Sequence, residues 1–103
     1  MPTIQAVVTW DTSLNKGTVP DITVPAQSGE TTITWTCGSD VASFTITGLD
    51  PNEFSPSSSD ANVTTFTTTD NDEQAQDYSY TVEATRASTG EKSRHDPKII
   101  NEP

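Results

Sequence analysis

Apolar and polar residues alternate along most of this chain. The clearest stretch is TTITWTC at 31–37, in which Ile33, Trp35 and Cys37 fall on one side and threonines on the other. Successive side chains of a β-strand point to opposite faces of a sheet, so this alternation predicts a strand with one buried face. The same kind of pattern predicts strands at residues 3–10, 21–26, 31–37, 41–49, 63–70, 77–87 and 92–100.

The segments between these strands hold the residues that favour turns. Residues 38–40 and 88–91 predict tight connections, and 49–62, with two prolines and a run of serines, predicts a long loop. No stretch of about ten or more residues has the period of an amphipathic helix. We therefore expect an all-β chain, and its 103 residues predict a single domain over residues 1–103.

The sixth predicted strand resembles one of a known superfamily. In DYSYTVEA at 77–84, Tyr80 lies near the start and the apolar Val82 follows two positions later. Both features are similar to the sixth strand of immunoglobulin-like and fibronectin type III domains, and the TRASTGEKS that follows is similar to their next hairpin. The resemblance implies a single immunoglobulin-like β-sandwich of about seven antiparallel strands. Antibody domains differ, because they pair two cysteines and bury a tryptophan of the third strand. Here Cys37 has no second cysteine, and Trp35 lies in what would be the second strand.

The composition implies a small core. Leu, Ile, Val and Phe account for 18 of the 103 residues and the net charge is −10, values close to those of disordered chains. The regular alternation and the abundance of threonine, whose branched Cβ favours strands, argue for a folded chain instead. The predicted core is centred on Ile33, Trp35, Cys37, Phe44, Ile46, Phe66, Tyr80 and Val82.

The acidic balance excludes several classes of partner. The chain has 15 Asp and Glu residues against 5 Lys and Arg residues, and the cations are isolated along the sequence. Phosphate groups are bound by clustered cations, so we expect neither nucleic acid nor an anionic membrane as a partner. No run of about 18 apolar residues predicts a membrane span, and Met1–Thr3 lacks the basic start and apolar stretch of a secretion signal. We expect a cytoplasmic location, or export by a route that needs no such signal.

Few residues are suited to covalent or metal chemistry. His95 is the one histidine and Cys37 the one cysteine. A blue-copper site requires two histidines and a cysteine, and a zinc site requires three or four ligands at spacings that this sequence lacks. Cys37 is expected to be buried beside Trp35, and His95, two residues before Pro97, is expected at an edge or bulge of the last strand. The chain is therefore predicted not to be an enzyme.

Carboxylates are concentrated in loops that a seven-stranded sandwich would bring to one end. Loops 25–30, 49–62 and 70–76 would emerge there, and loops 38–40 and 87–91 at the opposite end. Calcium binds six to eight oxygens from carboxylates, amides and carbonyls, so the acidic loops form a candidate calcium site. The predicted ligands are Asp50, Asn52, Asp70, Asp72 and Glu73, on a rim that also includes Glu30, Glu53 and Asn71. The alternative interpretation is a set of solvated loops that keep a small domain soluble.

Threonines repeat on the predicted outer face. Thr32, Thr34 and Thr36 alternate with apolar residues on one strand, and Thr45 and Thr47 do so on the next. We expect the two strands to be adjacent, so that these residues form one outward patch. Such arrays can bind ice, pack against a partner sheet or serve as an ordinary polar face with high strand propensity.

These properties predict a class of function rather than an activity. We expect a small, acidic, threonine-rich, non-enzymatic module for protein interaction or structure, with an unidentified protein partner. It is expected to be a monomer or a weak homo-oligomer. The alternative is a calcium-binding module of the adhesin type, with the acidic rim as its site.

Overall fold

The computed structural model describes residues 3–25, 29–59, 62–71 and 76–102. All regular secondary structure in these ranges is β-strand, and they contain no helix long and apolar enough to cross a membrane. The strands are β1 (Thr3–Asp11), β2 (Lys16–Thr18), β3 (Ile22–Val24), β4 (Thr31–Cys37), β5 (Val41–Thr47), β6 (Phe54–Ser55), β7 (Thr65–Asp70), β8 (Asp77–Ser79), β9 (Thr81–Arg86), β10 (Lys92–His95) and β11 (Lys98–Asn101).

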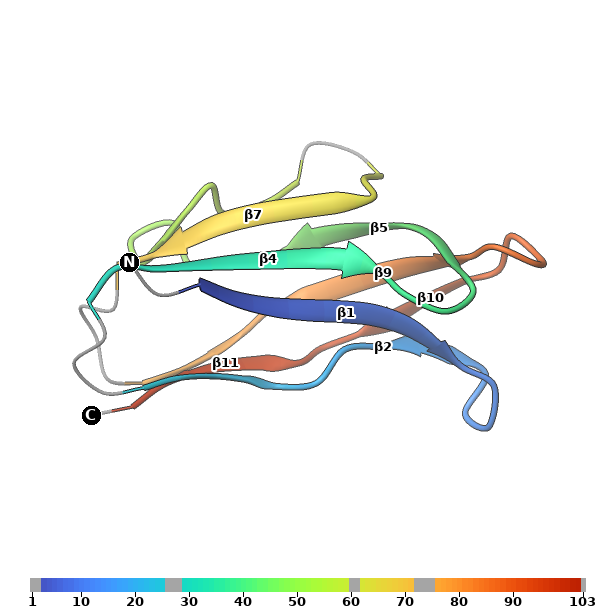
Figure 1. Ribbon diagram of the computed structural model, residues 1–103, viewed down its shortest axis with the longest axis horizontal. Helices are drawn as coiled ribbons and strands as arrows, with labels where there is room; N and C mark the ends of the chain where they lie inside the picture. The colour runs from blue at the N-terminus through green and yellow to red at the C-terminus, as the bar shows by residue number, and fades with distance from the viewer. Residues whose placement is uncertain (1–2, 26–28, 60–61, 72–75, 103) are drawn as a thin grey trace.

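The strands form one five-stranded sheet and two three-stranded sheets. The large sheet has the order β2-β1-β4-β7-β6, and the small sheets have the orders β10-β9-β5 and β3-β11-β8. In Figure 1, β1, β4 and β7 lie in front of β5, β9 and β10. Sheets layered in this way are compatible with the predicted β-sandwich.

Three long extended segments are each interrupted once. β3 follows β2 after residues 19–21, β9 follows β8 after Tyr80, and β11 follows β10 after residues 96–97. Pro20 and Pro97 lie in two of these interruptions, and proline cannot donate a hydrogen bond to a neighbouring strand. The two-residue β6 and all of β2 also fall in segments predicted as loops. The described ranges therefore hold eleven strands, where about seven are predicted from the sequence.

Two strand pairs are parallel, which corrects the prediction of a wholly antiparallel sandwich. β1 is parallel to β4, and β3 is parallel to β11. The cause is the hairpin between β1 and β2, in which Asp11 Oδ1 accepts hydrogen bonds from the N–H groups of Ser13 and Leu14. The chain reverses there and again before β4, so β1 and β4 run in the same direction.

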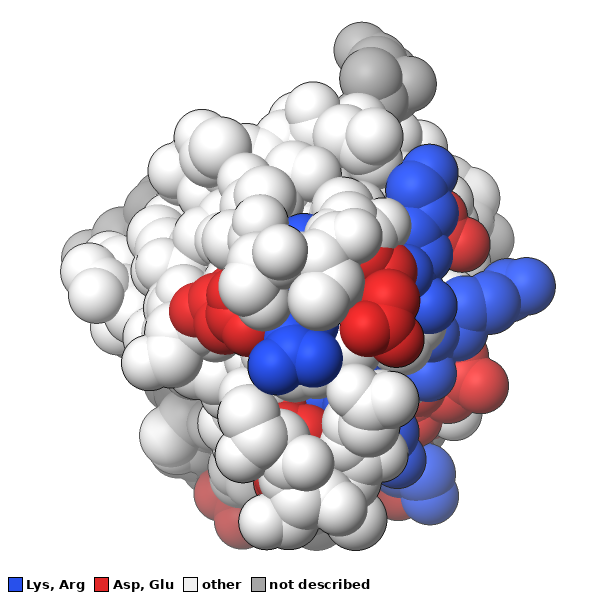
Figure 2. Space-filling view, turned by 90° about the vertical axis from the view of Figure 1, so that its right-hand side faces the viewer, with Lys and Arg blue, Asp and Glu red and all other residues white. Residues whose placement is uncertain are grey.

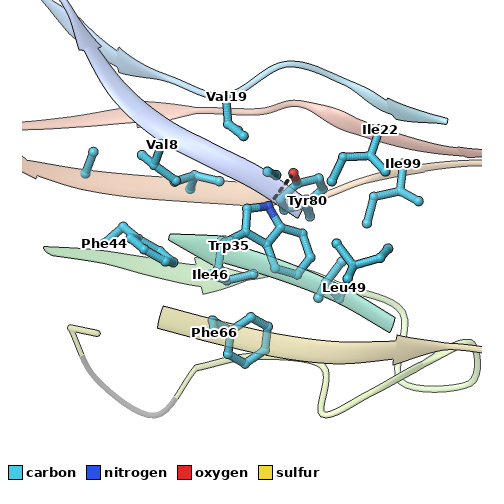
Figure 3. Packing of buried hydrophobic residues seen from close by; sticks show 14 of the residues in the cluster. Val8, Val19, Ile22, Trp35, Phe44, Ile46, Leu49, Phe66, Tyr80 and Ile99 are labelled. Atoms are coloured by element: carbon cyan, nitrogen blue, oxygen red, sulfur yellow. Dashed lines mark hydrogen bonds between the residues drawn. The ribbon is translucent and has the colours of Figure 1, made fainter. Parts of the chain in front are cut away.

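Trp35 lies at the centre of the core (Figure 3). Its side chain is fully buried, and its Nε1 donates a hydrogen bond to Tyr80 Oη at 3.1 Å. The centroid of its ring lies 5.6 Å from the ring centroids of Phe66 and Tyr80. The buried apolar cluster contains every residue of the predicted core except Cys37. The inward face predicted for these strands is therefore confirmed.

Cys37 is predicted to lie in the core, and the alternation that turns Phe44 and Ile46 inward would turn Ala42 inward as well. Neither residue points fully inward. Cys37, at the end of β4, is partly exposed, although burial still raises the pKa of its thiol. Ala42 is exposed, because the register between β5 and β9 shifts between Val41 and Ser43. Val41 is buried in its place. An irregularity of this kind moves a residue to the opposite face of the sheet.

β2 packs so closely on the second layer that Gly17 has no room for a side chain. A Cβ atom at Gly17 would lie 2.4 Å from Ala84 Cβ, and the Gly17 N–H donates to Ser93 Oγ at 2.7 Å. We expect Gly17→Ala to lower the free energy of unfolding by about 1–3 kcal/mol, the usual cost of overpacking. Chemical denaturation measures this loss. Adding Ala84→Gly should recover part of it, and an additive loss in the double variant would contradict the packing of β2 on β9.

Candidate functional site

The loop after β5 is anchored to the end of β7. Asp50 Oδ1 accepts a hydrogen bond from the N–H of Asn52, which starts a tight turn. The Asp50 carbonyl oxygen accepts hydrogen bonds from the N–H groups of Glu53 and Phe54. The Glu53 carbonyl oxygen accepts one from the N–H of Asn71, directly after β7. These bonds bring two of the loops predicted at the acidic end into contact.

Two carboxylates and an amide meet beneath this turn. Glu53, Asp70 and Asn101 are each at most 2% exposed. Asn101 Nδ2 donates to Glu53 Oε2 at 2.9 Å and to Asp70 Oδ1 at 3.2 Å. Asp70 and Asn101 occupy inward positions at the ends of β7 and β11, which places both of them under the turn. We call these three residues the buried polar cluster.

The buried polar cluster concentrates negative charge where water is scarce. Ionised carboxylates persist at such depth when they are paired, hydrogen-bonded or bound to a cation. The same charges affect the pKa of the neighbouring Tyr78. Burial is the main cause that raises the pKa of its phenol, and the charges of Glu53, Asp50 and Asp70 raise it further. The oxygens of this cluster are of the kind that hard cations such as calcium prefer as ligands.

Three of the five predicted calcium ligands lie at this end of the molecule, namely Asp50, Asn52 and Asp70. Asp72 and Glu73 lie outside the described residues. Asp70 is turned into the buried polar cluster, whereas Asn52 is exposed. Within the described ranges, no group of three His, Cys, Asp or Glu side chains is arranged to hold a metal ion.

Asn101 is not predicted as a site residue from the sequence. Glu53 is predicted to lie on the acidic rim, but it is not among the five predicted calcium ligands. Asn101 follows Ile99 at the two-residue spacing of an inward strand face, and this spacing is the one available signal. Glu53 and Asp70 lie 48 and 31 residues away from Asn101 in the chain. Contacts at such separations depend on how the strands assemble.

The opposite end of the molecule is held together by Arg86. Its Nε donates to Asp40 Oδ2 at 2.6 Å, and its guanidinium lies over the ring of Trp10, 5.5 Å from the centroid. The backbone N–H and the hydroxyl of Ser88 also donate to the Asp40 carboxylate. These contacts join the two loops predicted at this end.

The Asp40 carboxylate makes the stability of the fold depend on pH in the acid range. Its hydrogen bond with Arg86 is the main reason that its pKa lies below the ordinary value, followed by the bonds from Ser88. A carboxyl group with a lowered pKa in the folded state stabilises the fold above its unfolded pKa, and this contribution is lost as pH falls through the folded value. We expect Asp40→Asn to lower the melting temperature at pH 7, with a difference from wild type that shrinks below about pH 4. Thermal unfolding over a pH series measures this, and a difference that persists at the acid end would contradict it.

His95 and Cys37 do not meet. His95 lies in β10, at the edge of its sheet as predicted, and its Nε2 lies 3.2 Å from the carbonyl oxygen of Val19. Cys37 lies in β4, in a different sheet. Within the described part of the chain, no hydrogen bond joins these two residues, which are the ones that the sequence offers for nucleophilic chemistry.

Nine outward positions of β1, β4 and β7 form a regular uncharged surface. The register places three residues side by side in each of three rows. The rows are Thr3, Thr32 and Thr69; Gln5, Thr34 and Thr67; and Val7, Thr36 and Thr65. We call these nine residues the threonine face. Thr34 is at its centre, and Thr34 Oγ1 lies 3.1 Å from Thr67 Oγ1.

The predicted threonine patch on two consecutive strands is wrong in its pairing. Thr45 and Thr47 belong to β5, which pairs with β9, whereas β4 pairs with β1 and β7. A tight turn between consecutive strands suggests a hairpin, but here the chain crosses to the other layer at residues 38–40. The threonines of β4 and those of β5 therefore lie on opposite outer faces.

The outer face of β5, β9 and β10 carries charges. Its register forms one row of Thr45, Glu83 and Arg94 and a second row of Ser43, Thr85 and Lys92. The first row lines a shallow hollow of about 230 Å³. In Figure 2 the charged side chains gather at the centre and on the right, whereas the left side, toward β1, β4 and β7, is mostly white. Charge is thus divided unequally between the two outer faces.

Comparison with protein-family models gave no match, and comparison with curated proteins gave no match either. The functional inference therefore rests on the threonine face and the buried polar cluster.

Proposed function

We propose that this protein is a non-enzymatic β-sandwich of immunoglobulin-like topology that binds a partner protein through its threonine face. The sheet orders support the topology. Immunoglobulin constant domains place strands A, B, E and D in one sheet and strands C, F and G in the other. In chain order, strands A to G correspond to β1, β4, β5, β6, β7, β9 and β10. The observed orders β1-β4-β7-β6 and β5-β9-β10 are then A-B-E-D and C-F-G.

Two features depart from that scheme. β1 is parallel to β4, where the first two strands of such a domain would be antiparallel. Tyr80 Oη accepts a hydrogen bond from the Trp35 indole, whereas the tyrosine corner of these domains bonds to the backbone. Both departures leave the division of the strands between the two layers unchanged.

The binding proposal rests on the absence of charged residues from the threonine face. The chain has 15 acidic and 5 basic residues, and none of them occupies the nine positions. Interface cores are depleted in charged residues, because a charge that loses its water without gaining a partner is costly. Threonine also loses little side-chain freedom when it is covered, because its branched Cβ already restricts it. A partner can therefore cover this face without burying a charge.

The separation of His95 and Cys37 supports the non-enzymatic part of the proposal. The shallow hollow on the other outer face is lined by threonines together with Glu83 and Arg94. A nucleophile in hydrogen-bond reach of a base is the arrangement that covalent catalysis needs. At this hollow the Thr81 hydroxyl donates to the Asp96 carboxylate at 2.9 Å, and the lining includes neither a histidine nor a cysteine.

A photo-reactive amino acid placed at Thr34 tests the binding face, with Thr45 as the matched position. Both are half-exposed threonines in the middle of a strand, and each shares one side-chain hydrogen bond with a neighbour, Thr67 or Asn62. In cells that naturally make the protein, we expect covalent adducts with a protein from position 34 and few from position 45. Mass spectrometry identifies the adducts. Equal labelling from both positions, or none from position 34, would contradict the proposal.

The buried polar cluster favours a second candidate function, a calcium-dependent module of the adhesin type. Two carboxylates that converge on one amide provide the hard oxygen ligands that calcium prefers. Calcium bound only to the native state would stabilise it by about 2.7 kcal/mol when the free ion is about a hundredfold above the dissociation constant. For a domain of this size, we expect a rise of several degrees in melting temperature.

Sodium chloride at the same ionic strength is the control, because screening also relieves repulsion among carboxylates. Asp70→Asn should abolish the response to calcium, whereas Asp77→Asn, at an exposed position of the same end, should keep it. Equal rises in calcium and in matched salt would exclude the calcium function.

A further inference from the structure

We infer that one edge of β1 receives an extended segment of a partner protein as an added strand. β1 pairs with β4 along Thr3–Val8, but on its other side it pairs with β2 only along Thr9–Asp11. In Figure 1, β2 lies beside one end of β1, and the chain then continues as β3, which pairs with β11 in another sheet. No strand of the described residues pairs with Thr3–Val8 on this side, which we call the open edge. A segment added antiparallel to β1 would continue the line of β2.

The backbone of β1 presents hydrogen-bonding groups at the open edge. Successive residues of a strand direct their N–H and C=O groups to opposite sides. The Val8 carbonyl oxygen accepts a hydrogen bond from the N–H of Gly38, directly after β4. By alternation, Thr3, Gln5 and Val7 direct their backbone groups to the open edge. Such a row of donors and acceptors is what an extended segment of another chain recognises.

The open edge lacks the features that usually protect the edge of a sheet. Proteins protect such edges with charged side chains, proline, bulges or very short strands. The sequence of residues 3–8 is TIQAVV, which has neither a charge nor a proline. Its pairing with β4 continues without a bulge from Thr3 to Val8. The open edge is therefore a regular template for strand addition.

The other edges of the described sheets are short, covered or charged. β6 has two residues, and β2, β3 and β8 have three each. The edge of β5 is covered, because Phe44 exchanges two backbone hydrogen bonds with the segment before β7. β7 meets β6 at its end and the carbonyl oxygen of Pro56 at Thr68, and β10 exposes Lys92 and Arg94. Among the described edges, the open edge is the longest one with neither a strand partner nor a charge.

The side chains at the open edge indicate which residues the partner supplies. Ile4 faces inward but is only partly buried against the core, so an apolar side chain on the inward side of the added strand would complete its burial. Val7 faces outward and is 44% exposed. A β-branched residue opposite it would form a favourable cross-strand pair. The ligand class is therefore an uncharged extended segment in which apolar and β-branched polar residues alternate.

Hydrogen exchange with a defined probe provides the first test. The probe is the synthetic peptide TTITWTS, residues 31–37 with serine in place of Cys37, because β4 already pairs with the whole of Thr3–Val8. In the free protein, the amides of Gln5 and Val7 should exchange faster than that of Val8, which points toward β4. Adding the peptide should slow exchange at Gln5 and Val7, as NMR measures residue by residue.

The control peptide TTIPWTS has proline at its centre and should not slow this exchange, because proline interrupts the ladder. Slow exchange of Gln5 in the free protein, or no slowing by TTITWTS at its highest soluble concentration, would overturn the inference. Protection that appears without peptide as the protein concentration rises would show that a second copy occupies the edge, which overturns the assignment to another protein.

Substitution at Gln5 provides the second test. Gln5→Pro removes one donor from the open edge and none from the bonds with β4, so the fold should be retained, as circular dichroism checks. Peptide binding, measured by NMR titration of the Val7 amide, should weaken at least about tenfold, because the donor is lost and the proline ring blocks the approach. Gln5→Ala keeps the N–H and should bind like the wild type. Equal binding by the two variants would overturn the inference.

Val7→Lys provides a further variant that keeps every backbone donor. A lysine at an edge opposes strand addition, so this variant should also bind the peptide more weakly. Thr36→Lys is its matched control, because it adds the same charge to the next strand in the same row. Equal effects of Val7→Lys and Thr36→Lys would overturn the inference.

The inference goes beyond the proposed function, because backbone groups at an edge make this contact, whereas side chains of the threonine face make the proposed one. Thr34→Glu changes the centre of the face and leaves the open edge intact, so it should leave peptide binding unchanged. A loss of peptide binding in Thr34→Glu as large as that in Gln5→Pro would place the contact on the face and overturn the inference.

Discussion

Trp35→Ala should strongly destabilise the protein. Deleting a fully buried large aromatic side chain costs about 3–5 kcal/mol, and a domain of this size has a total stability of about 5–15 kcal/mol. The hydroxyl of Tyr80 would also lose the hydrogen bond that it accepts from the indole, and a buried polar group without its partner adds to the cost. Urea denaturation followed by circular dichroism measures the loss.

Thr36→Ala is the control for Trp35→Ala, because it changes the next residue of β4 on the outward face. Such a substitution should cost no more than about 0.5 kcal/mol. A loss below about 1 kcal/mol for Trp35→Ala would mean that the two faces of β4 are exchanged, as a register slip of one residue would do.

The second large effect is expected at Asn101. Asn101→Asp keeps the shape of the side chain but replaces the amide, which donates to Glu53 and Asp70, by a third carboxylate. Removing the partner of a buried charge costs about 3–5 kcal/mol. We expect a loss of that size at neutral pH, measured by chemical denaturation.

A swap of the two side chains tests the geometry of the cluster. Asp70→Asn added to Asn101→Asp restores one amide among the three residues, so it should recover at least half of the stability that Asn101→Asp loses. If the double variant is no more stable than the single one, the amide is not what holds the cluster together. Calcium added to Asn101→Asp reveals a cation role, since a third carboxylate should then make the response to the ion larger.

Local patterns in the sequence predict much of the fold. Residues 31–37 form β4 with the predicted bounds, and the inward set of Ile33 and Trp35 is buried as expected. The prediction succeeds because alternation has a period of two within one strand and needs no knowledge of the neighbours. It fails at Ala42, where the register shifts and alternation stops.

The candidate surfaces could be predicted only in part. The acidic end contains Asp50, Asn52 and Asp70 as expected, because loops at the same end of successive antiparallel strands emerge together. The contact of Asn101 with Glu53 could not be predicted, because the two residues meet only when the last strand lies under the turn after β5. Nothing in either local sequence specifies that contact.

The sequence by itself determined which residues of most strands face inward, and it places no charged residue at the nine positions of the threonine face. It did not determine that β1, β4 and β7 lie side by side, because the choice of neighbours depends on the packing of the whole core. In that packing the chain crosses to the other layer after β4, and β1 and β7 pair with the two edges of β4. Only the tertiary structure therefore turned threonines from positions 3 to 69 into one continuous surface.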